Sequence, residues 1–238
     1  MKFLLDNRLA PLTFTWGFLE SPVDNAVEAY VRWQKGILYS VRVEPIDQPL
    51  QTALEKLEPL DMESSTVLFL STKSSWTACF DNGLKGGNTY TFVGYLCEAL
   101  HCRGVLCRSI PNTLSKSTKG KRGTWGAVQF TLFSPVPTKF LNIERDISVM
   151  NDVSGWDFRI SGTPQPFEDT GRYEARKKAE RFTAEILEQY CRAIGIDPFN
   201  EAFYGGPGAI IRSHLRFGGS PKGTSLREAQ MNMGLLQP

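Results

Sequence analysis

Alternating apolar and polar positions predict a series of β-strands along the first two thirds of the chain. Residues 12–19 (LTFTWGFL) alternate and are rich in aromatic side chains, and residues 37–45 (ILYSVRVEP) place their apolar side chains on one face. Further strands are predicted at residues 66–71, 76–80, 105–110 and 124–135, and a hairpin is predicted at residues 141–162 with its turn near Asn151 and Asp152.

A second set of segments carries apolar residues at the three- and four-residue spacing of a helix. One helix begins after Ser21-Pro22 and ends at Gly36, a short one carries Leu50, Leu54 and Leu57, and a third covers residues 89–102. The longest is predicted from about Arg172 to Ile194. Its outer face would carry the pairs Glu174 with Lys178, Arg181 with Glu185, and Glu188 with Arg192. Residues four apart and oppositely charged support a helix by a few tenths of a kcal/mol per pair.

The order of these elements favours an α+β fold with a mixed, largely antiparallel sheet and about three main helices packed against it. Strands and helices do not alternate regularly, and residues 124–162 show the pattern of a meander. We expect a single domain over residues 1–217, with a helical C-terminal segment from about residue 166, and a flexible tail over residues 218–238. A domain break in the Pro-rich segment at residues 162–171 is the alternative.

The composition is that of an ordinary globular protein. Of the 238 residues 41% are hydrophobic and 22% are charged, and the formal net charge is +2, whereas a nucleic-acid-binding domain usually shows a clear basic excess. No run approaches the ~20 apolar residues that span a bilayer, and residues 6–8 interrupt the N-terminal apolar run too early for a signal peptide. Five cysteines, an odd number, do not suggest a secreted disulfide framework. We expect a cytoplasmic protein without a membrane partner.

The stretch at residues 74–96 (SSWTACFDNGLKGGNTYTFVGYL) combines two turn signals. Residues 81–83 (Asp-Asn-Gly) match a type I′ hairpin turn, and residues 86–88 (Gly-Gly-Asn) precede a helix that Asn88 or Thr89 can cap. A purely structural interpretation follows from these features. There is neither a GxGxxG spacing nor a Gly-Lys-Ser/Thr sequence, so no cofactor is predicted.

The other interpretation of this stretch is a ligand- or partner-binding site. A helix N-terminus leaves N–H groups that can hold a phosphate or a carboxylate. The predicted recognition residues are Trp76, Asp81, Asn82, Gly86, Gly87 and Asn88, with the first three side chains exposed.

Metal binding is not predicted, although Cys97, His101 and Cys102 are close together in the sequence. A structural zinc site has four ligands, and only Cys107 or the distant Cys79 could complete this set. Cys97 also falls on the apolar stripe of its predicted helix. Buried thiols are the simpler interpretation.

Candidates for catalysis are few. His101 is expected on a mostly buried helix and His214 near the tail, and no GxSxG, SxxK or reactive-cysteine motif is present. Carboxylates can act in pairs without a histidine. The candidate pairs are Glu144 with Asp146, Asp152 with Asp157, and Glu168 with Asp169. The alternatives are solvated residues on the wet face of a meander, or a helix cap at Asp169 or Thr170.

Two segments are basic. The loop at residues 111–123 holds Lys116, Lys119, Lys121 and Arg122, which could contact phosphates, although such loops are more commonly solvated and nucleic acid is not the favoured partner. Residues 166–182 are dense in arginine and lysine and offer a protein-binding face, with a solvated helix face as the alternative.

The preferred hypothesis is a non-catalytic cytoplasmic protein that binds another protein. Its bacterial version is an immunity-type protein that neutralises a toxin. The hypothesis depends on a well-patterned α+β domain with no nucleophile constellation and no cofactor fingerprint. The alternative is an enzyme or small-molecule binder for a phosphorylated or carboxylated ligand at residues 81–89, with Asp81 as acid or base. A third hypothesis is nucleic-acid binding through residues 116–122.

Overall fold

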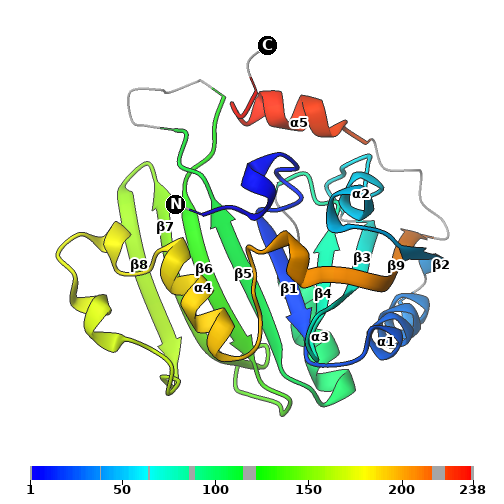
Figure 1. Ribbon diagram of the computed structural model, residues 1–238, viewed down its shortest axis with the longest axis horizontal. Coiled ribbons are helices and arrows are strands. Elements are labelled where there is room, and N and C mark those ends of the chain that lie inside the picture. Colours follow the sequence, from blue (N-terminus) through cyan, green and yellow to red (C-terminus); the bar gives the residue numbers. More distant parts are fainter. Residues whose placement is uncertain are drawn as a thin grey trace.

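The computed structural model describes residues 2–37, 39–63, 65–85, 89–114, 122–215 and 223–236. Within these residues nine strands form one sheet in the order β2-β9-β3-β4-β1-β5-β6-β7-β8, and neighbouring strands are antiparallel throughout (Figure 1). The strands are β1 (Thr15–Leu19), β2 (Tyr39–Asp47), β3 (Thr66–Thr72), β4 (Thr77–Asp81), β5 (Gly104–Ile110), β6 (Ala127–Phe133), β7 (Ile143–Asp152), β8 (Gly155–Gly162) and β9 (Tyr204–Leu215). The predicted α+β fold with a largely antiparallel sheet is confirmed.

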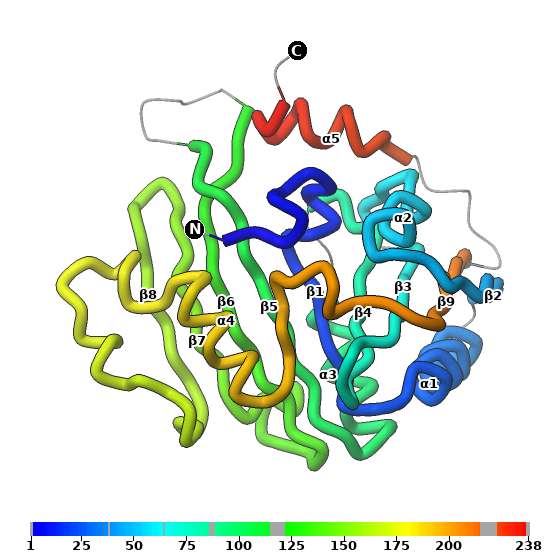
Figure 2. Tube along the Cα trace, viewed as in Figure 1, coloured from blue at the N-terminus to red at the C-terminus, as the bar shows by residue number. Residues whose placement is uncertain are grey.

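Helices lie on both faces of the sheet. They are α1 (Val23–Gly36), α2 (Leu50–Glu55), α3 (Thr89–Leu100), α4 (Ala184–Ala193) and α5 (Leu226–Asn232), with short 3-10 turns at η1 (Leu4–Asn7), η3 (Thr170–Glu174), η4 (Lys178–Glu180) and η5 (Glu201–Phe203). We call the side covered by α4, α2 and the N-terminal segment the α4 face, and the side covered by α1 and α3 the α3 face (Figures 1 and 2). None of the helices in the described residues is long and apolar enough to cross a membrane.

The two faces hold separate hydrophobic cores, because successive strand residues point to opposite sides. In β5, Val105 and Cys107 join the core of the α4 face while Leu106 joins that of the α3 face. Helix α3 packs closely on the strands beneath it. A Cβ atom on Gly17 of β1 would lie 2.5 Å from Cγ2 of Val93, so a glycine is needed at this contact.

The predicted hairpin at residues 141–162 is confirmed, with β7 ending at Asp152 and β8 beginning at Gly155. The Asp152 carboxylate accepts hydrogen bonds from the backbone N–H groups of Ser154 (2.7 Å) and Gly155 (3.2 Å). These two bonds hold the turn. The Asp152 carboxylate also accepts a hydrogen bond from the Ser154 hydroxyl, and this bond, together with the two from the backbone, lowers the pKa of Asp152.

The helix predicted from Arg172 to Ile194 is wrong in its first half. Residues 170–174 and 178–180 form separate 3-10 turns, and α4 begins only at Ala184. Tyr173 is buried, and Lys178 pairs with Asp157 of β8 at 3.0 Å. These tertiary contacts hold the segment against the sheet, and they outweigh its local preference for a helix. Of the predicted ion pairs along this segment, Glu188 with Arg192 is present at 3.0 Å.

Part of the segment expected to be a flexible tail forms α5. The Ser225 hydroxyl accepts a hydrogen bond from the N–H of Glu228, whose carboxylate accepts one in return from the N–H of Ser225, which makes a complete capping box. Gln230 donates to the carbonyl oxygen of Arg8 at 2.8 Å, and Ala229 is buried. The C-terminal helix is therefore fastened to the N-terminal segment.

Candidate functional site

The three side chains predicted to be exposed recognition groups, Trp76, Asp81 and Asn82, are buried, with exposed fractions of 2%, 2% and 1%. The prediction of exposure is wrong because β4 lies between β3 and β1 near the middle of the sheet. Trp76 donates from Nε1 to the carbonyl oxygen of Ile194 at 2.9 Å, which ties the β3–β4 hairpin to the end of α4.

Residues 81–83 do not form the predicted hairpin turn. Asp81 ends β4, its carboxylate accepts hydrogen bonds from the N–H of Gly83 (2.8 Å) and the hydroxyl of Thr89 (3.0 Å), and the chain continues into α3. The Asn82 side chain joins this loop to residues 59–66. It accepts from the N–H of Thr66 (2.9 Å) and donates to the carbonyl oxygen of Pro59 (2.7 Å) and to the carboxylate of Asp61 (3.1 Å).

These contacts favour the structural interpretation for Asp81 and Asn82, because their polar atoms hold the protein's own groups in place. A buried carboxylate bonded in this way is poorly placed to act on a ligand as acid or base. Gly86, Gly87 and Asn88 lie outside the described residues, as do Lys116, Lys119 and Lys121 of the basic loop.

The cysteines and histidines are the side chains that a metal or nucleophilic site would need. Within the described residues no three metal-ligating side chains come together. Cys107 and Cys191 are both buried, with their sulfur atoms 3.4 Å apart, and burial raises the pKa of the Cys191 thiol. A thiol with a raised pKa is a weak nucleophile at neutral pH. His101 and His214 are exposed.

The carboxylates proposed as catalytic pairs form hydrogen bonds or ion pairs with other side chains of the protein. Glu144 accepts from Gln165 at 3.1 Å, and Asp146 accepts from Gln129 at 2.8 Å. Asp157 accepts from Arg159, and Asp169 pairs with Arg172 at 3.6 Å. Asp169 makes no helix cap, because the chain beyond it is a 3-10 turn without a capping side-chain bond.

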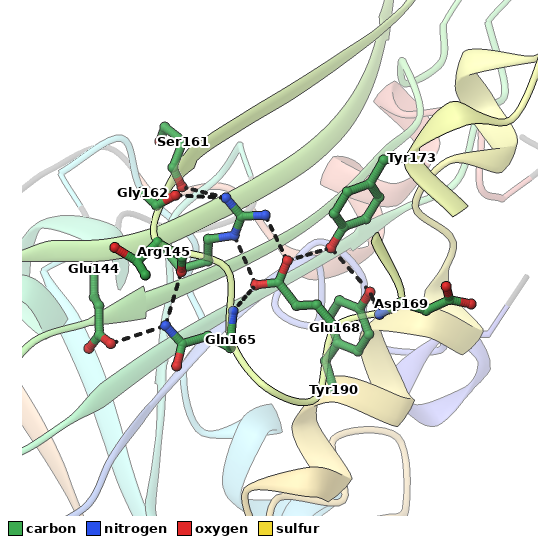
Figure 3. A network of polar contacts seen from close by, with 10 residues as sticks. Glu144, Arg145, Ser161, Gly162, Gln165, Glu168, Asp169, Tyr173 and Tyr190 are labelled. Carbon is green, nitrogen blue, oxygen red and sulfur yellow. Dashed lines mark hydrogen bonds and ion pairs between the residues drawn. The ribbon is translucent and has the colours of Figure 1, made fainter. Parts of the chain in front are cut away.

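A buried polar network centres on Arg145 and Glu168, on the α4 face (Figure 3). Both side chains are almost inaccessible, at 3% and 0% exposed, and they form a bidentate pair with N–O distances of 2.9 and 2.7 Å. Arg145 also donates to the carbonyl oxygen of Gly162 at 2.9 Å, and the Tyr173 hydroxyl donates to Glu168 at 2.8 Å. Burial alone would lower the pKa of Arg145, but the contact with Glu168 raises it.

This network is fully bonded and therefore structural. The Tyr190 hydroxyl lies 3.1 Å from that of Tyr173 and accepts a hydrogen bond from the N–H of Asp169 at 2.9 Å (Figure 3). The network fastens the Pro-rich segment at residues 162–171, the alternative site of a domain break, to β7 and α4. A buried ion pair needs such additional hydrogen bonds to offset its desolvation.

A second polar cluster lies on the α3 face, where β1, β5, β6 and β7 run side by side. Thr15, Arg108, Gln129 and Ser148 are cross-strand partners in one row, and Leu106, Thr131 and Asp146 are partners in the next. We call Thr15, Arg108, Gln129, Thr131 and Asp146 the Arg108 cluster. Asp146 accepts from Gln129 (2.8 Å) and Thr131 (2.6 Å), and Arg108 donates from Nε to Thr15 (3.1 Å).

The Arg108 cluster is less completely bonded than the Arg145 network. Arg108 is half-buried and forms no ion pair with a described residue, and no described atom accepts a hydrogen bond from its two terminal nitrogens. Burial lowers its pKa, while the charge of Asp146 acts in the opposite direction. Tyr90 of α3 lies near this cluster. Its pKa is raised mainly by burial and, to a smaller extent, by the charge of Asp146.

An apolar groove of about 480 Å³ opens between α3 and the loop at residues 134–142, with Trp33, Tyr95, Gly94, Pro137 and Leu141 in its walls. The Trp33 and Tyr95 rings stack with their centroids 4.8 Å apart. Smaller hollows of about 350 and 160 Å³ adjoin Trp33 on the side of α1. The groove and the two smaller hollows thus adjoin one another around Trp33.

The loop beside the groove exposes large apolar side chains. Val136, Phe140 and Leu141 are 62%, 66% and 58% exposed. Leu141 has a φ of +48° and Asn142 a φ of +59°, a left-handed conformation that is uncommon for a leucine. Asn142 holds the loop by donating to the carbonyl oxygen of Gly94 (3.3 Å) and to Glu98 (2.9 Å).

Sequence reasoning missed both the groove and the Arg108 cluster. The signal for the cluster was the pair Gln129 and Thr131, polar residues that alternate with apolar ones in an otherwise hydrophobic strand. The signal for the groove was the apolar pair Phe140-Leu141 where the connection from residue 135 meets the predicted hairpin, a place that is normally polar.

Comparison with protein-family models, with curated proteins and with solved structures found no match.

Proposed function

We propose that the protein acts by binding another protein, which inserts apolar side chains into the groove between α3 and the loop at residues 134–142. The observation that carries the proposal is the conformation and exposure of Leu141. Its left-handed backbone holds a bulky apolar side chain out into solvent at the rim of an apolar groove. Backbone conformations of this kind cost about 1–3 kcal/mol and tend to be found at functional sites.

The surroundings of Leu141 support this proposal. Of the large apolar side chains that the described part of the chain exposes, Tyr95 and Leu141 line the groove and Ile37 lines the adjoining hollows. Val136 and Phe140 are exposed on the loop beside the groove. Contiguous exposed apolar surface is uncommon on a protein that works alone and often marks a protein–protein interface. The stacked Trp33 and Tyr95 rings supply the aromatic side chains that dominate binding energy at such interfaces.

The experiment is a comparison of partners retained from native lysate by the wild-type chain and by Leu141→Asp and Phe140→Asp. Both side chains are exposed, so the variants should fold. Val153→Asp is the matched control, because Val153 is 61% exposed but lies in the β7–β8 turn. A stoichiometric partner held by the wild type and by Val153→Asp, and lost from the two loop variants, supports the proposal.

Two outcomes contradict it. One is a partner that all four chains hold equally. The other is a dimer of the chain itself that Leu141→Asp dissociates, measured by light scattering after gel filtration, since the groove would then bind a second copy. A toxin as the partner is the more specific hypothesis. It requires that co-expression of the wild-type chain, but not of Leu141→Asp, restores growth to cells that produce the candidate toxin.

A further inference from the structure

The Arg108 cluster places an unmatched positive charge on the face of a sheet. Arg108 has five N–H groups on its guanidinium, and among the described residues only the Nε–H has a partner, the hydroxyl of Thr15 at 3.1 Å. A half-buried charge that has lost part of its water without gaining a counter-ion is unfavourable. The free end of Arg108 is thus arranged for a partner from outside the chain.

The negative charge of Asp146 acts on Arg108, but the Asp146 carboxylate is hydrogen-bonded to other groups. Its Oδ1 atom accepts from the Gln129 amide at 2.8 Å and from the Thr131 hydroxyl at 2.6 Å. Its distance from Arg108 is too long for an ion pair, although its charge still acts on the guanidinium. Asp146 therefore orients Gln129 instead of neutralising Arg108.

The orientation of Gln129 adds an acceptor to the cluster. Since the amide nitrogen donates to Asp146, the amide oxygen points elsewhere, and this Oε1 atom is buried without a hydrogen-bond partner in the described structure. Gln129 as a whole is 6% exposed. Buried amide oxygens are nearly always bonded, so an orphaned one requires an explanation.

We propose that the Arg108 cluster binds a small carboxylate or phosphate that carries a neighbouring hydroxyl or amino group. The terminal nitrogens of Arg108 hold the anion in the forked geometry that suits two oxygens. The neighbouring hydroxyl or amino group donates to Oε1 of Gln129. Tyr90, at the first turn of α3, borders both this cluster and the apolar groove. The anion site does not depend on the proposed protein partner.

The test uses the full chain in a low-salt buffer and two probes, sodium phosphate and sodium malate, with sodium chloride at matched ionic strength as the reference. Thermal unfolding is followed at increasing probe concentration, because a ligand that binds only the folded state raises the melting temperature. Arg108→Gln removes the charge and should weaken binding by at least about tenfold. Arg159→Gln is the control and should change it by less than about twofold, because Arg159 lies on the same sheet face but is 80% exposed.

A rise with phosphate alone assigns the site to phosphates, and a rise with malate alone assigns it to hydroxycarboxylates. No rise with either probe up to about 20 mM, well above the millimolar range of weak small-ligand binding, overturns the proposal. The proposal is also overturned if the probe raises the melting temperature of Arg108→Gln as much as that of the wild type. If that variant does not fold, the guanidinium resonances of the wild type decide the matter: Arg108 must shift on addition of the probe while Arg159 does not. Leu141→Asp should bind the probe normally, which separates this site from the groove.

Discussion

Two arginines of the same sheet, Arg145 and Arg108, illustrate opposite ways of placing a charge inside a protein. Arg145 lies on the α4 face, where Glu168 and two carbonyl oxygens take up its donors (Figure 3). Arg108 lies on the α3 face with one donor used, and Asp146, whose charge acts on it, is bonded to neutral side chains. Complete bonding favours stability, whereas incomplete bonding leaves capacity for a ligand.

Removing Glu168 should have the largest effect, because it leaves Arg145 charged and buried. We expect Glu168→Ala to lower the free energy of unfolding by about 3–5 kcal/mol, measured by urea denaturation. Glu28→Ala is the matched control: Glu28 pairs with Arg32, but both are about three quarters exposed, so the loss should be less than about 1 kcal/mol. Equal losses in the two variants would show that the Arg145 network does not have the structural role assigned to it.

Asn82 should come next, because it is buried and fully bonded but neutral. Asn82→Ala removes hydrogen bonds to residues 59–66 and leaves the N–H of Thr66 without its side-chain acceptor. We expect a loss of about 2–4 kcal/mol in the same measurement. Asn151→Ala, which removes an amide at a half-buried position bonded to Asn112, should cost less than about 1 kcal/mol. A loss for Asn82→Ala no larger than that of its control would argue that its surroundings are open to water.

Arg108→Met should have a small effect in a buffer free of multivalent anions. The substitution removes an unpaired charge and keeps most of the apolar stem, so the free energy of unfolding should change by less than about 1 kcal/mol in either direction. Arg145→Met, the matched variant on the other face, should destabilise by several times that amount. Similar losses at the two positions would contradict the distinction between a satisfied and an unsatisfied arginine.

The smallest effect is expected at the exposed edge of the sheet, where Asp157 pairs with Arg159 and Lys178. The hydrogen bond from Arg159 and that from Lys178 lower the pKa of Asp157 to about 2. A lowered carboxylate pKa contributes stability that is present above the unfolded pKa near 4 and is lost as the pH falls toward 2. The urea midpoint of Asp157→Asn should thus lie slightly below that of the wild type at pH 7, and the gap should narrow below pH 4. A gap that widens on acidification would reverse the assigned sign.

Much of the fold followed from local pattern. The strand pattern and the turn signal near Asn151 and Asp152 were enough to predict the β7–β8 hairpin, because both depend on residues close together in the chain. The predicted helix at residues 172–194 failed over its first half for the opposite reason. Tyr173 and Lys178 contact Tyr190 and Asp157, which are distant in the chain, and those tertiary contacts outweigh a helical preference worth tenths of a kcal/mol per residue.

The candidate sites were less predictable than the fold. Asp81-Asn82-Gly83 has the sequence of an exposed hairpin turn, yet Asp81 ends an inner strand and Asn82 bonds to residues 59–66. The apolar loop ending at Leu141 gave a visible signal, but its exposure depends on how Asn142 is held by α3.

Local periodicity located strands β1 to β8 and helices α1 to α3, since strands and helices follow from periods of two and of about 3.6 residues. The inner strand β9 was not predicted. Which polar groups are buried, and which of those are hydrogen-bonded, was settled by the packing of the folded chain. That outcome depends on strand order and cross-strand register, which bring Thr15, Arg108 and Gln129 into one row although they are far apart in the chain. Local pattern carries no information on such distant neighbours, so the same arginine in a strand can become a structural pair or an open anion site.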